Sequence, residues 1–381
     1  MTTEKVREAV TGGISNAIAR TWSGKASVNG WFYPVPTAVT LEVKRHDGEV
    51  LHIAAETGVF RRDLKQPGAS HAGWKASFDI DSIDFEAPHF VIAEVDGLPE
   101  KRKLVFNLID DRPVIEAHLA KYRRIDKPYS WASPAITALM TETFAPELYV
   151  FDRDEFARWR AEVDYDRNYP KYVDDFHYCI EAKAREHYLS ALMANMAAGG
   201  IFMDGAASQS PFDHLTERLY GTKTYRQDLN YPAGVHGMTV GSNAQSIPLP
   251  DGSLDGIVSH NAWEHFEGES RNGFIKESMR LLKPGGIMCI LPIVCSEHTH
   301  VLTSPSCWFT KYINDHELPG FDPRAAIYVD EPAQQRQVMI MSPGDLKDDL
   351  DQIPNMDFRV LDVRDETGRH VMYAMTGTRR G

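Results

Sequence analysis

The stretch 251-DGSLDGIVSHNAWEHFEGESRNGFIKESMRLLKPGGIMCILPIV-294 holds two apolar runs separated by a charged segment. The first run, LDGIVS, and the second, IMCILPIV, have the length and the apolar content of buried strands. The segment between them is long enough for an amphipathic helix, and the KPGG turn would end it. A buried strand, a helix and a second buried strand form the unit from which parallel α/β sheets are built.

Polar residues crowd the turn that follows the first of these two strands. The sequence SHNAWEHFEG places His260, Glu264 and His265 directly after the apolar run. In an open α/β sheet, ligands bind outside the carboxyl ends of the strands. We therefore expect this turn to border a functional site.

Further strand-like runs flank this unit on both sides. They are IFMD, KTYRQDL and MTVGS before it, and DFRVLDV and HVMYAMTGT after it. Most of these runs are separated by enough chain for a crossover connection, and the last two could form a hairpin. The pattern predicts an α/β domain with a doubly wound, mostly parallel sheet over residues 185–381.

The chain before residue 185 has a different pattern. Residues 25–105 alternate short β-prone runs with turns such as HDGE and VDGLPE, which is typical of a small antiparallel β-sandwich domain. Residues 106–184 contain mostly helical patterns, and we interpret them as a helical linker or lid region. Residues 1–24 are predicted to form an N-terminal helical segment.

The composition argues against several classes of partner. The formal net charge is -13 and the 41 basic residues are spread along the chain, so we expect no nucleic-acid partner. No uncharged apolar run approaches the roughly 20 residues of a membrane helix. The N-terminal sequence MTTEKVREAVTGG lacks the apolar core of a secretory signal, which predicts a cytoplasmic protein. The four cysteines include no CxxC pair, and we expect neither a disulfide nor a zinc site.

The ends of the other predicted strands are polar as well. Asp204 follows IFM and is itself followed by the small residues of GAASQSP, which let a ligand approach the backbone closely. Asp228 ends the next strand, at a distance along the chain from which a carboxylate can accept hydrogen bonds from both ribose hydroxyls. The third strand is followed by Asn243 and Ala244.

Over roughly residues 185–375 the sequence resembles the class I S-adenosylmethionine-dependent methyltransferases. The resemblance is carried by IPLPDGSLDGIVSHNAWEHF, by RLLKPGG and by IMCILPIV. It implies a Rossmann-like methyltransferase fold, S-adenosylmethionine as the cofactor and methyl transfer as the reaction. More narrowly, MDGAASQSPF, RQDLNYPAG and SHNAWEHFEGES are similar to methyltransferases of bacterial surface polysaccharides and small molecules. The runs GWFYP, RRDL and GWKASFDI resemble the β-sandwich module that often accompanies such enzymes.

The resemblance implies a role for each of the strand-end residues. Asp204 would support the first loop and the methionine end of the cofactor, and the backbone of Ala206 and Ser208 would contact the cofactor. Asp228 would hold the ribose. The remaining cofactor contacts would be Asn243 and Ala244 at the adenine, and Ser259 to Asn261, including His260, under the sulfonium.

Two features depart from the family pattern. The family usually has acid-x-Gly-x-Gly-x-Gly in the first loop, whereas Ala206, Ser208 and Ser210 occupy the glycine positions here. Alanine and serine allow a close backbone approach but disfavour a positive φ, so we expect a tilted loop, a loop that binds the cofactor weakly, or a loop that binds it through the serine hydroxyls. Asn243 stands where the family often has aspartate, and its carbonyl can still accept a hydrogen bond from the adenine amino group.

Histidines and an acidic residue stand where the methyl acceptor would enter. Methyl transfer needs the donor and the nucleophile to be held about 3 Å apart and aligned. A hydroxyl acceptor must also lose its proton, and the ordinary pKa of histidine, about 6.5, suits this role. His265 is the first candidate for the general base and His298 the second, while Glu264 would orient a histidine or bind an acceptor hydroxyl. Alternatively, the Glu264–His265 pair only caps a helix, with the histidine packed and neutral.

The sequence thus predicts an S-adenosylmethionine-dependent methyltransferase that acts on a hydroxyl of a sugar or related small metabolite, in polysaccharide biosynthesis. A non-catalytic binding or scaffold protein with this fold is the first alternative, because the glycines of the loop are missing. A nicotinamide-dependent Rossmann oxidoreductase is the second, because it shares the strand, the small-residue loop and the later acidic residue. We expect a small-molecule or carbohydrate acceptor and no metal, and the β-rich region could mediate assembly of a homo-oligomer.

Overall fold

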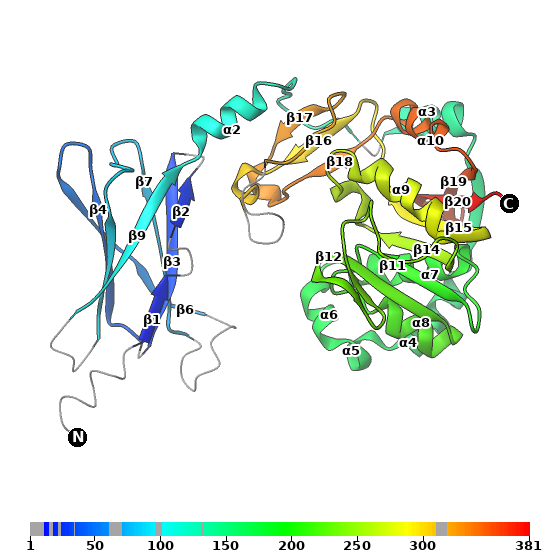
Figure 1. Cartoon of the computed structure of the whole chain (residues 1–381), viewed down its shortest axis with the longest axis horizontal. Coiled ribbons are helices and arrows are strands. Elements are labelled where there is room, and N and C mark those ends of the chain that lie inside the picture. The colour runs from blue at the N-terminus through cyan, green and yellow to red at the C-terminus, as the bar shows by residue number, and fades with distance from the viewer. Residues whose placement is uncertain are drawn as a thin grey trace. The chain divides into compact units, whose positions relative to one another are not determined.

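The computed structural model describes residues 11–14, 18–21, 24–33, 35–60, 71–95, 101–130, 133–309 and 318–381 (Figure 1). The chain divides into two compact units, Met1–Lys121 and Tyr122–Gly381. In the described ranges, no helix is long and apolar enough to cross a membrane.

The first unit contains two sheets. One has the order β1 (Thr11–Ile14), β3 (Lys25–Tyr33), β7 (Gly73–Asp79) and β6 (Glu56–Val59). The other has the order β2 (Ile18–Thr21), β9 (Arg102–Asp110), β8 (His89–Glu94), β4 (Ala38–Lys44) and β5 (Val50–Ala54), and α2 (Arg112–Leu119) follows β9. Buried and more exposed residues alternate along β3 and β4, as expected for strands with one face on a core. Val28 and Trp74 of one sheet and Leu41 and Val91 of the other belong to a single hydrophobic cluster.

The prediction of a helical segment over residues 1–24 is wrong where the structure can be compared with it. Thr11–Ile14 pairs with β3 and Ile18–Thr21 pairs with β9, so both segments are strands. Two adjacent glycines in TGGI disfavour a helix, and pairing with a neighbouring strand satisfies the backbone instead. Residues 1–10 lie outside the described residues.

The second unit is organised around an eight-stranded sheet. Its order is β10 (Glu147–Phe151), β19 (Met356–Asp365), β20 (His370–Arg379), β15 (Leu282–Ile293), β14 (Leu254–His260), β11 (Ile201–Gly205), β12 (Lys223–His236) and β13 (Thr239–Gly241). β20 runs antiparallel to both of its neighbours, and the other neighbouring pairs are parallel. This confirms the predicted α/β fold, including the final hairpin of β19 and β20.

The strand order marks where a ligand would bind. From β11 the chain moves outward on one side of the sheet to β12 and β13, and then returns to the other side of β11 with β14 and β15. The order therefore reverses between β11 and β14. In doubly wound sheets the crevice at this switch point, outside the carboxyl ends of the strands, is the ligand site.

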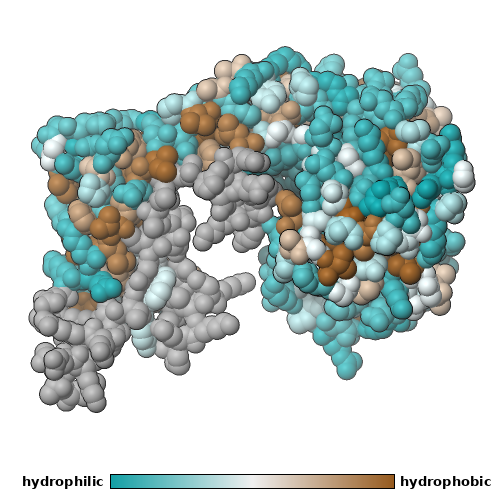
Figure 2. Space-filling view, in the orientation of Figure 1, coloured by the Kyte–Doolittle hydropathy of each residue, from teal (hydrophilic) through white to brown (hydrophobic). Residues whose placement is uncertain are grey.

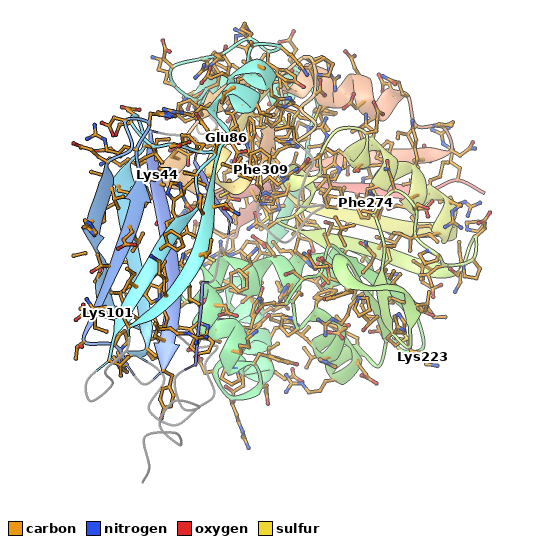
Figure 3. The ribbon with its side chains drawn as sticks, turned by 60° about the vertical axis from the view of Figure 1, so that its left-hand side comes forward. Lys44, Glu86, Lys101, Lys223, Phe274 and Phe309 are labelled. Atoms are coloured by element: carbon orange, nitrogen blue, oxygen red, sulfur yellow. The ribbon has the colours of Figure 1, made fainter. Side chains whose placement is uncertain are left out.

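Helices cover the sheet and fix the loops around this crevice (Figure 1). The helices of the second unit are α3 (Pro134–Phe144), α4 (Arg153–Val163), α5 (Tyr165–Asn168), α6 (Pro170–Phe176), α7 (Ile180–Met193), α8 (Phe212–Tyr220), α9 (Ser270–Leu281) and α10 (Pro343–Asp351). α7 packs against β14 and β15, where Tyr188 and Leu189 join Val258 and Leu291 in one hydrophobic cluster. On α9, the ring of Phe274 leaves no room for a side chain at Gly205, since a Cβ there would lie 2.9 Å from the ring (Figure 3).

Some elements of the second unit were not predicted. Glu147–Phe151, inside the expected helical linker, is an edge strand that runs parallel to β19. A separate three-stranded sheet has the order β17 (Ala326–Val329), β16 (His300–Thr303) and β18 (Val338–Ile340). The face of the second unit seen in Figure 2 is mainly hydrophilic and carries a compact group of hydrophobic residues.

Candidate functional site

The loop that follows β11 has a strained backbone. Ala206 has a φ of 57° and Ser208 a φ of 45°, both in the left-handed region. This region costs a residue other than glycine roughly 1–2 kcal/mol. The expectation that alanine and serine would avoid a positive φ here is therefore wrong, because the loop adopts it at two of the three positions where the family has glycine.

Hydrogen bonds from β12 hold this conformation. The Ala206 N–H donates to Gln227 Oε1 at 3.1 Å, and the Ala207 N–H donates to the Gln227 carbonyl at 2.8 Å. The Ser208 N–H donates to Asp228 Oδ2 at 2.8 Å. Three successive amides of the loop are thus bound by two successive residues of the neighbouring strand.

The carbonyl of Ser208 is held from the same strand. The Arg226 guanidinium donates to it at 3.1 Å, and the Tyr231 hydroxyl donates to it as well. Strained backbone persists where the surrounding structure fixes it, and such positions cluster at functional sites. Contacts at both the amide and the carbonyl of Ser208 explain why serine can occupy a position that favours glycine.

The strain predicts an unusual response to glycine. Ala206→Gly should leave the free energy of unfolding unchanged or raise it by up to about 1 kcal/mol, because relief of the positive φ offsets the greater freedom of glycine in the unfolded chain. Ala207→Gly is the matched control, since Ala207 is buried and is not among the residues with a positive φ, and it should lose about 1 kcal/mol. Urea unfolding of both variants makes the comparison. Equal losses would show that Ala206 carries no strain.

Buried polar groups meet at the carboxyl ends of β11 and β14. Asp204 Oδ1 lies 3.2 Å from His260 Nδ1, and His260 Nε2 lies 2.6 Å from Ser190 Oγ. Asp204 Oδ2 and Ser259 Oγ are shielded from water and have no hydrogen-bond partner among the described residues. Leaving such an atom unpaired costs about 1–3 kcal/mol, and in proteins a bound ligand or an ordered water commonly supplies the partner. These two atoms fit a ligand with polar groups, seated at the switch point of the sheet.

One face of α7 contributes polar residues that the sequence reading missed. Lys183, Glu186, His187 and Ser190 recur at helical spacing, so their side chains lie on neighbouring turns of the same face. The His187 ring lies 4.9 Å from the His260 ring, and Lys183 Nζ lies 3.6 Å from Glu186 Oε2. The spacing of K-x-x-E-H-x-x-S was the available signal, because a polar row on a largely buried helix indicates a polar site.

His187 is a buried histidine that the fold keeps neutral. It is 1% exposed, and its Nδ1 lies 2.8 Å from the Tyr165 hydroxyl. Burial lowers the pKa of His187 well below its ordinary value, and the nearby His260 and Lys183 lower it further.

This lowered pKa predicts how stability depends on pH. The unfolded chain protonates His187 below about pH 6.5 while the folded state does not, so folding loses up to about 1.4 kcal/mol per pH unit as the pH falls below that value. Wild-type protein should therefore lose more stability between pH 7 and pH 5 than His187→Phe does. Burial raises the pKa of Glu186, so this residue makes folding more favourable as the pH falls. It is present in both the wild type and the His187→Phe variant, so it does not account for a difference between them. Parallel curves of unfolding free energy against pH would contradict the assignment, and His214→Gln, at an exposed position, is the control.

Glu264 and His265 lie together in the 3₁₀ turn η2 (Trp263–His265), directly after β14. His265 Nδ1 lies 2.8 Å from the Gln337 carbonyl, and because a carbonyl only accepts, Nδ1 carries the hydrogen. In the neutral ring Nε2 is then the acceptor, and it lies 3.9 Å from Glu264 Oε1. Asn261, with φ 49°, connects the turn to α7 through its side-chain amide. Oriented to suit these neighbours, the amide nitrogen donates to Glu264 Oε1 at 2.8 Å and the amide oxygen accepts from Lys183 Nζ at 2.9 Å.

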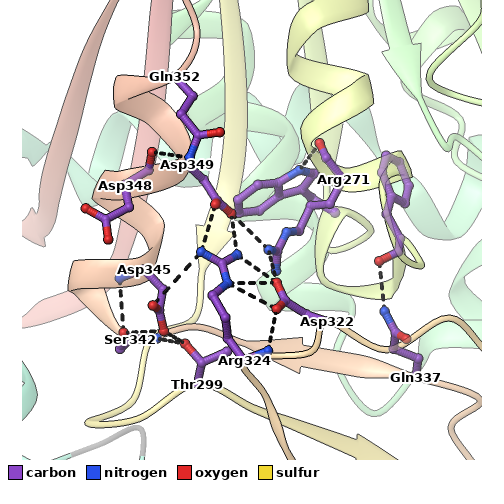
Figure 4. Close-up of polar contacts among 12 residues, drawn as sticks. Arg271, Thr299, Asp322, Arg324, Gln337, Ser342, Asp345, Asp348, Asp349 and Gln352 are labelled. Carbon is purple, nitrogen blue, oxygen red and sulfur yellow. Dashed lines mark hydrogen bonds and ion pairs between the residues drawn. The ribbon is translucent and has the colours of Figure 1, made fainter.

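A buried ionic network fixes the segment after this turn (Figure 4). Arg271 at the start of α9 is 4% exposed, and its guanidinium lies 3.1 Å from Asp349 of α10 and 3.6 Å from Asp322. Arg324 contacts both of these carboxylates. The Arg271 guanidinium also lies over the Trp263 ring, and the Trp263 indole donates to the Arg271 carbonyl at 3.1 Å. The network therefore positions the turn that carries Glu264 and His265.

Asp228 and the predicted adenine residues lie at the outer side of the site. Both carboxylate oxygens of Asp228 accept backbone amides at 2.8 Å, from Ser208 and from Asn230, and the residue is 6% exposed. Asn243 is exposed after β13, while Ala244 beside it is buried. Asp228 is thus tied to the loop after β11, whereas Asn243 makes its side-chain contact with the Gln245 amide.

His298 makes no described contact with the other predicted catalytic residues. It is exposed in the loop before β16, and its ring packs edge-on against Tyr129 at 5.0 Å. In the part of the chain that the structure describes, its contacts connect it neither with Asp204 nor with His265. The structure thus places Asp204 and Glu264 at the carboxyl ends of β11 and β14, where the strand order reverses. His298 has no described contact with either residue.

Comparison with known proteins shows what part of this chain is similar to. A family model described as "Methyltransferase domain" matches residues 210–290. The chain is 27% identical over 175 residues to a "Probable S-adenosylmethionine-dependent methyltransferase" of Mycobacterium tuberculosis, which covers 45% of this chain and 55% of that protein. A similarly named protein of Mycolicibacterium smegmatis is 29% identical over 111 residues, covering 29% of this chain and 36% of that protein. The chain thus spans about half the length, or less, of these curated relatives.

Solved methyltransferase structures also align with the chain. The 1,6-didemethyltoxoflavin-N1-methyltransferase of Burkholderia thailandensis, determined with S-adenosylhomocysteine, gives a TM-score of 0.34 at 12% identity and covers 68% of this chain and 94% of that one. Residues 210–290 thus match the methyltransferase domain family, and the curated relatives to which the chain is similar are named probable S-adenosylmethionine-dependent methyltransferases. These matches support the predictions of an enzyme and of S-adenosylmethionine as its cofactor.

Proposed function

We propose that the protein is a methyltransferase that moves a methyl group from S-adenosylmethionine to a hydroxyl of a small molecule. The observation that carries this proposal is the shape of the loop after β11, which holds Ala206 and Ser208 at positive φ where the family has glycine. Each of these residues costs roughly 1–2 kcal/mol, and strain of this size is retained where function requires it. In a non-catalytic protein whose loop no longer bound the cofactor, there would be no functional reason to retain this strain.

The residues at the switch point suit S-adenosylmethionine. Asp204 Oδ2, which has no partner among the described residues, would accept hydrogen bonds from the ammonium group of the cofactor. The oxygens of Asp228 each accept one backbone amide and keep lone pairs for ribose hydroxyls. Asn243 and Ala244 would border the adenine, with His260 below the sulfonium. When bound, the cofactor supplies an electrophilic methyl group.

His265 is the proposed general base. Its Nε2 is the free acceptor of the neutral ring, and the 42% exposure of the side chain leaves it accessible to an acceptor hydroxyl. Glu264 lies close enough to stabilise the imidazolium after the proton has moved to Nε2. We prefer His265 to His298, because His265 lies directly after β14 and His298 has no described contact with the polar groups at the switch point.

We also propose roles beyond the methyltransferase domain. We propose a cytoplasmic location, and the resemblance to polysaccharide methyltransferases makes a sugar hydroxyl one candidate acceptor. The two sheets of the first unit, whose buried residues share one cluster, support a β-sandwich module that would bind carbohydrate or a partner protein, including a second copy of the chain. These roles rest on the sequence and on the first unit's own architecture.

The activity is tested by acceptor-dependent release of S-adenosylhomocysteine. The full chain would be incubated with S-adenosylmethionine and a panel of hydroxyl-bearing sugars, phenols and alcohols. We expect product in the presence of at least one hydroxyl acceptor, and none without it. Binding of a nicotinamide dinucleotide instead of S-adenosylmethionine would contradict the proposal.

A further inference from the structure

An apolar cavity of 690 Å³ lies within the second unit, beside the proposed cofactor site. Its walls come from the end of β15, the start of β20 and the first turns of α3. The residues that line its apolar part include Ile136, Ile293, Val294, Val371 and Met372. Its volume falls within the range of about 300–1,000 Å³ that is typical of small-molecule sites.

Strand register places this cavity next to the proposed site. Leu291 of β15 pairs with His260 of β14, and the Asn261 N–H donates to the Leu291 carbonyl at 3.0 Å. Pro292, the next residue of β15, already lines the cavity. On the other side, Ile293 pairs with Tyr373, and because β20 is antiparallel to β15 its first residues lie at the same edge of the sheet. The cavity therefore opens one strand away from the residue proposed to lie under the sulfonium.

Several of the polar side chains that line the cavity are bonded to other residues, such as His370, whose Nδ1 lies 2.7 Å from Asp362 Oδ1. Ser133 Oγ is shielded from water and has no hydrogen-bond partner among the described residues, while the Tyr373 hydroxyl is bonded to Thr137. A sugar that entered would bury several hydroxyls, each of which costs about 1–3 kcal/mol if it finds no partner. An apolar molecule with a single hydroxyl avoids this cost, since its body contacts the aliphatic walls and one polar group is enough to orient it.

The other large cavity of the second unit is chemically different. It has a volume of 720 Å³ and is lined by charged residues of α4, α7 and the turn between β19 and β20, among them Arg153, Arg160, Arg185 and Glu366. Neither cavity is lined by the residues proposed to hold the cofactor, but of these two only the apolar cavity is lined by Pro292, which follows Leu291, the partner of His260 in the sheet. The apolar cavity is therefore the better candidate for the methyl acceptor.

We propose that this apolar cavity binds the methyl acceptor, and that the acceptor is a largely apolar molecule the size of a fused aromatic ring system that carries a hydroxyl. This rests on the proposed function and replaces a free sugar as the expected acceptor. The hydroxyl would face β14, and the apolar body would lie between Val294 and Met372.

The test uses 2-naphthol as the probe and the full chain saturated with S-adenosylhomocysteine. Fluorescence titration should detect binding to the wild-type protein and no displacement by glucose. Val294→Trp and Met372→Trp fill the cavity, and each should weaken 2-naphthol binding at least about tenfold, which equals 1.4 kcal/mol. Val150→Trp adds the same ring at an exposed position outside the cavity and should bind 2-naphthol as the wild type does.

The outcomes separate this inference from the proposed function. Normal binding of S-adenosylhomocysteine by the two cavity variants, with weakened binding of 2-naphthol, supports both. A wild-type protein that binds S-adenosylhomocysteine but not 2-naphthol, or cavity variants that bind 2-naphthol normally, would overturn the inference and leave the proposed function standing. A folded protein that does not bind S-adenosylhomocysteine would contradict the proposed function, and the inference would fall with it.

Discussion

Replacing His265 with alanine is expected to lower kcat for methyl transfer to a hydroxyl by about 10²- to 10⁴-fold, with little change in the affinity for S-adenosylmethionine. The imidazole is fixed by the bond from Nδ1 to the Gln337 carbonyl, which leaves Nε2 to take the proton. Without it, the acceptor hydroxyl would have to lose its proton to water. Turnover is measured as release of S-adenosylhomocysteine with the acceptor that the wild-type protein accepts.

His298→Ala is the matched control for this effect. His298 is exposed in a loop and contacts Tyr129, so its removal should leave kcat close to that of the wild type. A His265→Ala enzyme with full activity, or a larger loss in His298→Ala, would require another base.

Asp228→Ala is expected to weaken binding of S-adenosylhomocysteine about 100-fold or more. The carboxylate accepts the amides of Ser208 and Asn230, and hydrogen bonds to a charged group contribute about 1.5–3 kcal/mol each. Their loss releases the strained loop after β11 and also removes the proposed ribose contact. The dissociation constant is measured by calorimetry on protein that circular dichroism shows to be folded.

Two further variants separate the local effect from a general loss of stability. Asp228→Asn keeps one acceptor oxygen and should bind with intermediate affinity. Asp255→Asn removes a carboxylate that accepts the Ile201 N–H at the amino ends of β11 and β14, away from the proposed cofactor site. This variant should bind S-adenosylhomocysteine normally. If Asp228→Ala binds as tightly as the wild type, the loop is not the cofactor site.

The elements that sequence predicted well are those with a strong local pattern. The strands β11, β14 and β15 are buried on both faces and read as apolar runs, so their positions and their crossover connections were evident. The polar residues at the carboxyl ends of the strands were also evident, because ligands bind at these ends in an open α/β sheet. Asp204, Asp228 and Glu264 were therefore found as candidates from the sequence alone.

The elements that were missed depend on distant partners. Strands of three or four residues, such as β2 and β16, carry too little pattern to stand out, and their pairing with β9 and β17 defines them. On α7 the polar residues Glu186 and His187 are buried, while Tyr178 just before the helix is 77% exposed, which is the reverse of what hydropathy alone would predict. The role of buried polar residues on a helix can be inferred only when the side chains that face them from other elements are known.

The loop after β11 shows the same limit at the level of the backbone. Local preference predicted that Ala206 and Ser208 would avoid a positive φ. Bonds from Gln227 and Asp228, about twenty residues further along the chain, override that preference. The departure from the family's glycines therefore changes the residues of the loop without changing the left-handed conformation at these two positions.

The most direct test of a cofactor site at the switch point is a calorimetric titration of the folded full chain with S-adenosylhomocysteine. We expect binding of one molecule per chain in the micromolar range, since the loop, Asp204 and Asp228 are in place to receive it. A folded protein that shows no binding would contradict the proposed cofactor site, because the strained loop and the unpaired atom of Asp204 would then have some other cause.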